Sequence, residues 1–387
     1  MQADVTILGA GAAGLTCAMA CARRGRRVVV IDHAATPARK VLASGGGRCN
    51  CTNLEVGASD YRCANPHFTK SVLARFGPSD LLEWLAAGGV ATAAEAGGKV
   101  FCRDGGRAMA RFLEGQARQA GARCLLDATV RGACQDGDAF VVATAAGSVH
   151  STALVLALGG QSWPALGATG LGYALARRFG LAVTPLRPGL VPLTAGPDMA
   201  DLCRELAGIA LPVRLTVGTT TVAGDLLFTH RGLSGPAVLD ASLAWTPGTE
   251  LRIDFLPGVD VAAHLAGAGK QEIHNALAGL LPRRLAGALC RHLGLSGPVA
   301  GLSPKRQRAL ADRLAAFPCT PAGTAGWTKA EVTAGGVATD GISSKSLEAT
   351  GVPGLYVIGE LLDVTGRLGG FNLHWAFASG FAAGDRA

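Results

Sequence analysis

The chain has 387 residues, of which 49% are hydrophobic and 17% charged, which excludes a disordered protein and allows two or three domains. No apolar run reaches the roughly 18 residues of a membrane span, and the 11 cysteines lack the spacing of a disulfide-bonded domain. The opening MQADVTILGAG has no basic leader, and the net charge is +8. We therefore expect a soluble, cytoplasmic protein with reduced thiols.

The first elements follow a nucleotide-binding pattern. Residues 4–8 (DVTIL) predict a short buried strand, 15–24 a helix and 27–31 (RVVVI) a second strand. A G-x-G-x-x-G turn separates the first strand from the helix, and Asp32 follows the second strand. Strand, glycine turn, helix, strand and acid in this order predict a βαβ unit that binds a nucleotide cofactor.

Each part of this unit has a physical task. We expect Gly9 to make the tight turn, Gly11 to admit a pyrophosphate and Gly14 to let the helix pack closely. The unpaired N–H groups at the helix start favour phosphate, and Asp32 can accept both ribose hydroxyls of an adenosine. The predicted nucleotide contacts are Gly9, Gly11, Ala12, Ala13, Gly14 and Asp32.

The next segment, SGGGRCNCTN at 44–53, allows three readings: a metal site, a phosphate cradle or a mobile loop. Its C-x-C spacing has no second cysteine pair, so zinc has little support. Three consecutive glycines can bring N–H groups against a cofactor without Cβ clashes. Lys40 and Arg48 can offset pyrophosphate charge. The segments before and after it in the chain indicate whether it is a phosphate cradle or a mobile loop.

The remaining nucleotide-domain elements are widely separated. A helical stretch is predicted over 65–120, and a buried strand over 153–158 leads into Gly159-Gly160. A further buried strand over 354–358 ends at Gly359-Glu360. An NAD dehydrogenase would continue through further βαβ units. A nucleotide domain completed by the C-terminus favours FAD, whose long ribityl chain and flavin are held by distant segments.

The middle of the chain differs from both ends. Short alternating runs over 190–256 predict an antiparallel β-domain, and 261–316 predicts about three helices. The predicted fold is α/β: a Rossmann-like FAD-binding domain interrupted by an antiparallel β-domain and a helical domain. The expected boundaries are 1–189 with 328–387, then 190–257, then 258–327.

Three runs resemble the bacterial BaiN-type flavoproteins. They are KVLASGGGRCNCTN, LLFTHRGLSGPAVL (226–239) and GLYVIGELLDVTGRLGGFNLHWAFASGFAAG (354–384). The likeness covers nearly the whole chain in the right order. Members of this family are three-domain FAD enzymes that include aminoacetone oxidases, bile-acid ene-reductases and ribosomal-RNA dihydrouridine synthases.

The resemblance implies that 44–50 cradles the flavin side of FAD and that the β-domain binds substrate. It also implies that Glu360 holds ribityl hydroxyls and that the last helix points its N–H groups at the flavin N1–C2=O locus. The chain departs from the family pattern at Leu171, usually an acid, and at His374, usually Gln. The further cofactor candidates are Lys40, Ser44, Gly45, Gly46, Gly47, Arg48, Asn50, Gly159, Gly359, Glu360, Asp363, Gly370, Phe371, Asn372 and Leu373.

Three side chains are candidate acids. Cys49 would lie near the flavin and could donate a proton, although a small buried residue is the alternative. His230 has Thr229, Arg231 and Ser234 as motif neighbours, which favours a cleft. His374 is either a substituted cofactor contact or an acid.

These features favour an NAD(P)H-fed FAD reductase of an activated C=C bond, with a ribosomal-RNA uracil as substrate. The alternatives are a flavin oxidase of a small amine and an RNA-binding flavoprotein without turnover. No second G-x-G-x-x-G is present for NAD(P)H, which would dock transiently. No metal is expected, and no feature specifies an oligomeric state.

A basic segment, 280–316, is either a solvated helical face or a binding surface for RNA. Its RNA candidates are Arg283, Arg284, Arg291, Lys305, Arg306 and Arg308.

Overall fold

The computed structural model describes residues 1–387, and the chain forms two compact units. The first unit contains Met1–Arg187 and Val332–Ala387, and the second contains Pro188–Glu331. The C-terminal segment therefore completes the unit with which the chain begins. No helix is long and apolar enough to cross a membrane.

A parallel five-stranded sheet forms the centre of the first unit, in the order β21-β11-β1-β2-β7. Its three inner strands read VTIL, VVVI and ALVL and are buried along their whole length, as parallel strands covered on both faces should be. The predicted α/β class with a Rossmann-type sheet is confirmed. The strands are β1 (Val5–Leu8), β2 (Val28–Ile31), β7 (Arg123–Leu125), β11 (Ala153–Leu156) and β21 (Leu355–Val357).

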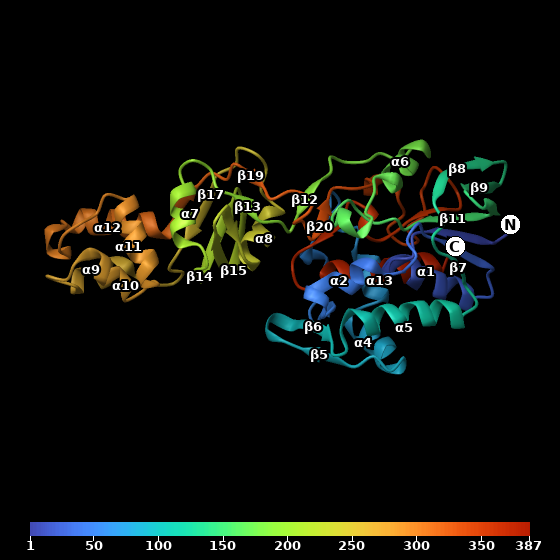
Figure 1. Ribbon diagram of the computed structural model, residues 1–387, viewed down its shortest axis with the longest axis horizontal. Coiled ribbons are helices and arrows are strands. Elements are labelled where there is room, and N and C mark those ends of the chain that lie inside the picture. The colour runs from blue at the N-terminus through green and yellow to red at the C-terminus, as the bar shows by residue number, and fades with distance from the viewer. The chain divides into compact units, whose positions relative to one another are not determined.

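Three long helices lie together on one side of this sheet (Figure 1). They are α1 (Ala12–Arg23), α5 (Gly105–Gln119) and α13 (Phe371–Gly384), and α1 packs against both of the others. An antiparallel sheet lies on the other side of β11, formed by β8 (Val130–Asp136), β9 (Ala139–Thr144) and β10 (Gly147–Ser151). The last helix, which the resemblance implied, is present as α13 and begins at Phe371.

The prediction of a helical stretch over 65–120 was wrong in its middle. Between the helices lies a hairpin of β5 (Thr92–Ala94) and β6 (Lys99–Cys102), whose other edge pairs with β3 (Asn50–Asn53). Gly97 and Gly98 both have positive φ, which lets the chain reverse there. The other elements of this unit are α2 (Arg39–Ala43), β4 (Tyr61–Arg62), α3 (Lys70–Arg75), α4 (Pro78–Ala87), α6 (Leu171–Arg178), β20 (Val332–Ala334) and β22 (Thr365–Gly366).

The second unit contains a seven-stranded antiparallel sheet in the order β18-β17-β14-β15-β16-β13-β19. Its two longest strands are joined by a tight hairpin at Gly218, where φ is +55°. The strands are β13 (Leu193–Thr194), β14 (Ala210–Val217), β15 (Thr220–Thr229), β16 (Gly232–Ser234), β17 (Leu251–Asp254), β18 (Phe317–Cys319) and β19 (Gly323–Thr324). A short strand, β12 (Arg187–Gly189), leads into this unit.

The last four of the six helices of the second unit lie between the neighbouring strands β17 and β18 in the chain and group at one end of the sheet (Figure 1). The sheet and these helices share one apolar core. The expected division of this region into a β-domain over 190–257 and a helical domain over 258–327 stays a prediction. The helices are α7 (Ala200–Leu206), α8 (Pro236–Ser242), α9 (Val261–Gly267), α10 (Ile273–Ala278), α11 (Arg283–His292) and α12 (Pro304–Ala315).

Candidate cofactor site

Four loops of the first unit meet at one edge of the parallel sheet. The chain leaves β1 at Gly9, β2 at Asp32, β11 toward Gly159 and β21 toward Gly359. These strands are neighbours and run in the same direction, so their carboxyl ends share that edge. In doubly wound α/β folds this edge is where ligands bind.

The glycine turn has two packing glycines and one open glycine. Gly9 has a φ of +105°, and a Cβ there would collide with the carbonyl of Ala157. A Cβ at Gly14 would collide with the carbonyl of Gly9. At Gly11, by contrast, nothing lies within 4 Å of the position of a Cβ. No side chain caps α1, so its first N–H groups, including those of Ala12 and Ala13, face this open space.

Asp32 fixes the geometry beside the turn. Its Oδ2 accepts the N–H of Ala10 at 2.7 Å, and its Oδ1 accepts the N–H of Ala34 at 2.8 Å. The ring of His33 lies 3.5 Å from Oδ1. Each carboxylate oxygen has more than one acceptor position, so Asp32 can hold the turn in place and still accept a ribose hydroxyl.

The SGGG segment forms an open 3-10 turn over Ser44–Gly47. Gly45, Gly46 and Gly47 all have positive φ, and nothing lies within 4 Å of the Cβ position at Gly46. The Ser44 hydroxyl donates to the carbonyl of Val41 at 2.9 Å, which ties the turn to α2. A backbone that only glycine tolerates, with open space beside it, has the form of a ligand cradle.

Lys40 and Glu360 form an ion pair with each other. The Nζ of Lys40 lies 2.5 Å from Oε2 of Glu360 and also donates to the hydroxyl of Ser162 at 2.7 Å. Burial alone would raise the pKa of Glu360, but the nearby ammonium and the hydrogen bonds outweigh it and hold that pKa below its ordinary value. Glu360 is therefore a carboxylate whose place is set by Lys40.

Ser162 and Thr333 belong to this network, although no motif pointed to them. Oε1 of Glu360 accepts the Ser162 hydroxyl at 3.0 Å and the N–H of Thr333 at 2.9 Å. The Thr333 hydroxyl accepts the N–H groups of Gln161 and Ser162. A Cβ at Gly160 would collide with the Thr333 hydroxyl. The second glycine after β11 was the available signal for this close approach.

Arg48 and Asn50 lie at the far end of the cradle. Arg48 pairs with Glu95 at 2.9 Å and lies over the ring of Phe101 at 3.9 Å, with its side chain half exposed. With its amide oriented to satisfy its surroundings, Asn50 accepts the N–H of Gly370 at 3.2 Å. The cradle is thereby joined to the start of α13, which brings together two segments that the sequence separates by 320 residues.

The start of α13 presents uncapped N–H groups. Gly370 has a φ of +100°, and a Cβ there would collide with the carbonyl of Thr52. The amide of Asn372 exchanges two hydrogen bonds of 2.8 Å with the backbone of Gly366. No side chain caps the helix, so the N–H groups of Phe371, Asn372 and Leu373 remain available to an anion or a carbonyl.

Asp363 lies outside the Lys40 network. Its Oδ2 accepts the Thr184 hydroxyl at 3.2 Å. Burial raises the pKa of Asp363, and the hydrogen bond from Thr184 and the charge of Arg187 only partly offset this effect. The structure thus separates the two acids that follow β21.

Two of the candidate acids are closed to solvent. Cys49 is fully buried, and burial raises the pKa of its thiol to about 12, so it is protonated at neutral pH. His374 is also fully buried, and burial lowers its pKa to about 4. Because the carbonyl of Phe76 can only accept, Nε2 of His374 donates to it at 3.2 Å, and Nδ1 lies 2.9 Å from the Thr52 hydroxyl. Both contacts are those of a structural histidine.

His230 is exposed. It lies with Arg231 in the turn between β15 and β16 of the second unit. The Thr229 hydroxyl closes this turn by donating to the carbonyl of Gly232 at 2.9 Å. Of the three candidate acids, His230 is therefore the one that is exposed to solvent.

The candidate RNA-binding cations lie on two helices with different neighbours. Helix α11 packs against α7 and α10, and α12 packs against α9 and β17. Arg291 pairs with Glu205, and Arg284 donates to the carbonyl of Ala207. Those on α11 are Arg283, Arg284 and Arg291, and those on α12 are Lys305, Arg306 and Arg308. Two of the six are thus engaged within the unit.

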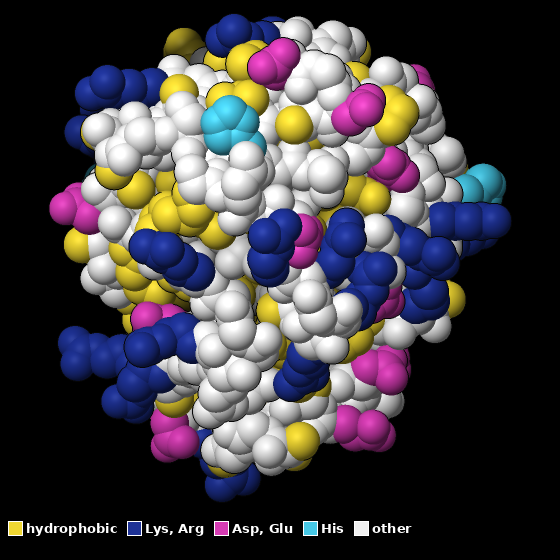
Figure 2. All heavy atoms as spheres, turned by 90° about the vertical axis from the view of Figure 1, so that its right-hand side faces the viewer, with side chains coloured by type: hydrophobic (Ala, Val, Ile, Leu, Met, Phe, Trp, Pro, Cys, Tyr) yellow, Lys and Arg dark blue, Asp and Glu magenta, His cyan; other side chains and the backbone are white.

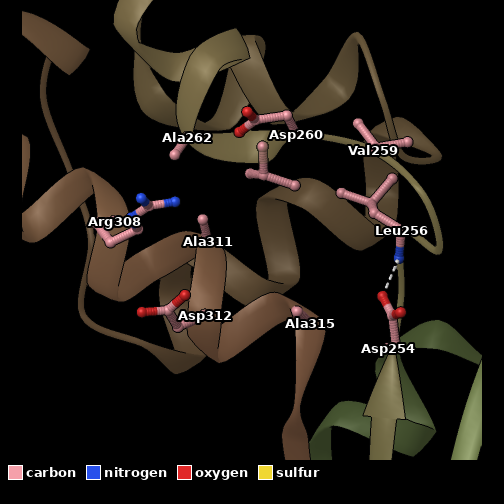
Figure 3. Close-up of a pocket in the computed structure, with 10 residues that line it drawn as sticks. Asp254, Leu256, Val259, Asp260, Ala262, Arg308, Ala311, Asp312 and Ala315 are labelled. Carbon is pink, nitrogen blue, oxygen red and sulfur yellow. Dashed lines mark hydrogen bonds between the residues drawn. The ribbon is translucent and has the colours of Figure 1, made fainter.

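A pocket of about 150 Å³ opens beside α12 in the second unit (Figure 3). Arg308 and the acids Asp254, Asp260 and Asp312 contribute to its lining. Two of these acids have local roles, because Asp254 accepts the N–H of Leu256 at 3.1 Å and Asp260 caps α9. No group of three or more His, Cys, Asp or Glu residues is placed to hold a metal ion.

Comparison with known proteins identifies the family. A family model described as the HI0933-like protein Rossmann domain matches residues 3–386. The chain belongs to this family. It is 42% identical over 386 residues to the ribosomal RNA dihydrouridine synthase of Escherichia coli (strain K12), with 98% of this chain and 96% of that protein covered. The resemblance inferred from the three sequence runs is thereby confirmed.

Other HI0933-like relatives differ in their named substrates. The chain is 31% identical over 405 residues to a 3-dehydro-bile acid delta(4,6)-reductase of Clostridium scindens, with 99% of this chain and 98% of that protein covered. Both named relatives are oxidoreductases. Among solved structures, the open conformation of a flavocytochrome c3 fumarate reductase matches 99% of this chain and 78% of that chain, at 17% identity and a TM-score of 0.49.

Proposed function

We propose that this protein is an FAD-dependent reductase of an activated C=C bond and that its substrate is a uracil of ribosomal RNA, reduced to dihydrouridine. The observation that carries the proposal is the 42% identity, over 98% of the chain, to a protein named for that reaction. The second relative is named for reduction of a different substrate, which supports reduction more broadly than it supports RNA.

The residues at the sheet edge fit FAD. Space is open at the Cβ positions of Gly11 and Gly46, and helices α1 and α13 begin with uncapped N–H groups. The turn at Gly9–Gly14 would hold the pyrophosphate, and Asp32 would hold the adenosine ribose. Ser44–Asn50 and the start of α13 would hold the flavin side, with Glu360 and Lys40 between them.

Reduced FAD supplies a hydride, so the protein must orient the substrate and deliver one proton. In the reduction of a C=C bond conjugated to a carbonyl, that proton goes to the carbon next to the carbonyl. His230 is the donor we favour, because Cys49 and His374 are fully buried. NAD(P)H is the proposed reductant and would dock transiently, since the chain has one glycine-rich dinucleotide turn.

The test uses ribosomal RNA from Escherichia coli that lacks its own ribosomal RNA dihydrouridine synthase. Purified FAD-loaded protein is incubated with this RNA and NADPH or NADH, and nucleosides are analysed by mass spectrometry. We expect a uridine that gains two hydrogens, only when both FAD and the reductant are present. A reduced, FAD-loaded enzyme that leaves every uridine unchanged would contradict the RNA assignment.

A second candidate is a small unsaturated ketone, favoured by the 31% identity to the bile-acid reductase. It requires the same hydride and proton transfers, so it shares the cofactor site and differs only in substrate. Turnover of a steroid enone, without any change in RNA, would support it. The amine oxidase alternative predicts peroxide release with a small amine and no need for NAD(P)H.

A further inference from the structure

Helix α5 begins directly at the candidate cofactor cradle. A Cβ at Gly105 would lie 2.9 Å from the carbonyl oxygen of Gly47, and one at Gly106 would lie 2.6 Å from that of Val41. The first turn of the helix therefore packs on the backbone of α2 and of the SGGG turn. From there its 15 residues extend for about 22 Å, alongside α1.

The two faces of α5 have opposite character. The inner face is apolar and buried, with Met109, Phe112, Leu113 and Ala117. The outer face carries Arg107, Arg111 and Arg118, all exposed. At about 100° per residue these three arginines lie within roughly 40° of one another around the helix. We call them the α5 ridge.

The ridge is not neutralised by partners within the protein. None of its three arginines takes part in an ion pair, whereas Arg48 and Arg291 each pair with a glutamate. One acid, Glu114, lies on the same face, between Arg111 and Arg118, and is half-buried. The ridge therefore keeps a net positive charge.

The charge of the whole chain has the same bias. The first unit holds 23 Lys and Arg against 17 Asp and Glu, and the second holds 13 against 11. Figure 2 shows one face of the first unit, where dark-blue Lys and Arg side chains are interspersed with magenta carboxylates. The first unit thus has a net charge of +6 and the second a net charge of +2, because acids elsewhere in the second unit offset most of the +6 of the basic segment 280–316.

We propose that the α5 ridge binds the phosphate backbone of the RNA substrate next to the cofactor cradle. The inference rests on the proposed function, since it takes the substrate to be RNA. Every cation on α5 is arginine, whose planar guanidinium can bind a phosphate in a bidentate manner. A ridge that starts at the cradle would hold the strand while the target base, unstacked, reaches the flavin.

The test compares two variants that lose the same charge. One replaces the ridge (R107Q/R111Q/R118Q), and the control replaces three exposed arginines of the second unit that already have acidic partners (R204Q/R214Q/R252Q). Binding to ribosomal RNA is measured over a range of salt concentrations. We expect the ridge variant to lower the slope of log K against log salt by about two to three, and the control by less than about one. FAD content and reduction by NAD(P)H should stay at the wild-type level in both.

Glu114→Gln provides the opposite change, because it removes the one acid that lies on the same face of α5 as the ridge. We expect it to bind RNA several-fold more tightly at low salt. A ridge variant with wild-type slope and wild-type dihydrouridine yield would overturn the inference and leave the proposed function standing. A wild-type protein that neither binds RNA at low salt nor forms dihydrouridine would overturn both.

Discussion

At Gly11 the backbone leaves open space where a side chain would otherwise stand. Gly11→Val should therefore fold and yet lose FAD, because the new side chain would occupy the proposed pyrophosphate position. The measurement is the flavin-to-protein ratio after purification, together with the thermal unfolding midpoint of the apoprotein. A Gly11→Val variant with a normal FAD content would show that the phosphates bind elsewhere.

Gly14→Ala is the matched control for that prediction. A Cβ at Gly14 would meet the carbonyl of Gly9, so we expect this smaller change to damage the fold itself, with a lower unfolding midpoint even without cofactor. Equal stability of the two variants would contradict the distinction between an open and a packing glycine.

His374 should make stability depend on pH. Burial lowers its pKa to about 4, whereas the unfolded chain has an ordinary histidine near 6.5. As the pH is lowered, the unfolded state therefore binds the proton at a higher pH than the folded state does. The contribution of the neutral histidine to the free energy of unfolding is complete above about pH 6.5 and is lost as the pH falls toward 4. The full effect is about 3 kcal/mol. Urea unfolding should show that the free energy of unfolding of wild type falls, relative to that of His374→Gln, as the pH is lowered from about 6.5 toward 4. A difference that is constant with pH would contradict the neutral, buried histidine.

The candidate acids are separated by single substitutions. We expect His230→Ala to lower turnover by about 10²-fold or more with FAD retained, because a positioned proton donor contributes that much. Cys49→Ala should change turnover less than tenfold, because the thiol is fully buried and its pKa is raised to about 12. The reverse result would assign proton transfer to Cys49.

At the scale of elements, the packing of α13 on α1 positions the last part of the site. A Cβ at Gly380 would lie 2.6 Å from the carbonyl oxygen of Ala13. Gly380→Ala should force the helices apart and destabilise the protein by about 2 kcal/mol or more. Gly115→Ala in α5 has open space and should stabilise by roughly 0.5–1 kcal/mol. The measurement is the thermal unfolding midpoint of both variants. A Gly380→Ala protein with wild-type stability and full FAD content would contradict the close packing of α13 on α1.

Elements with strong local patterns could be predicted from the sequence. The runs of β1 and β2 are apolar apart from Thr6 and are bounded by glycine or an acid, so both were located within a residue or two. The hairpin at 92–102 was missed because its strands are short, although Gly97-Gly98 was a usable turn signal. Four helices lie in the region where about three were expected.

Contacts between distant segments could not be predicted. The motifs placed Lys40 and Glu360 in the same cofactor region, but nothing in the sequence indicated that they pair with each other. Arg48 was expected to face phosphate, and its partner Glu95 lies in the hairpin that was missed. Thr333 belongs to no motif at all. Long-range partners depend on how strands are ordered in the sheet, which local periodicity does not determine.

At the scale of the whole molecule, the chain combines the open sheet edge of a Rossmann-type domain with a net charge of +6 in the same unit. If the substrate is RNA, the enzyme needs both a cofactor that carries hydride and a surface that binds phosphate. An enzyme for a small neutral ketone has no use for that charge. The oxidant that the reduced protein accepts therefore distinguishes an RNA reductase from the alternatives.

That choice can be measured directly. The protein is reduced anaerobically with NAD(P)H, and re-oxidation of the flavin absorbance is followed after addition of unmodified ribosomal RNA or air. We predict rapid re-oxidation by the RNA, with one dihydrouridine formed per flavin re-oxidised, and slow re-oxidation by air. Re-oxidation by air with release of peroxide, and none by RNA, would contradict the reductase.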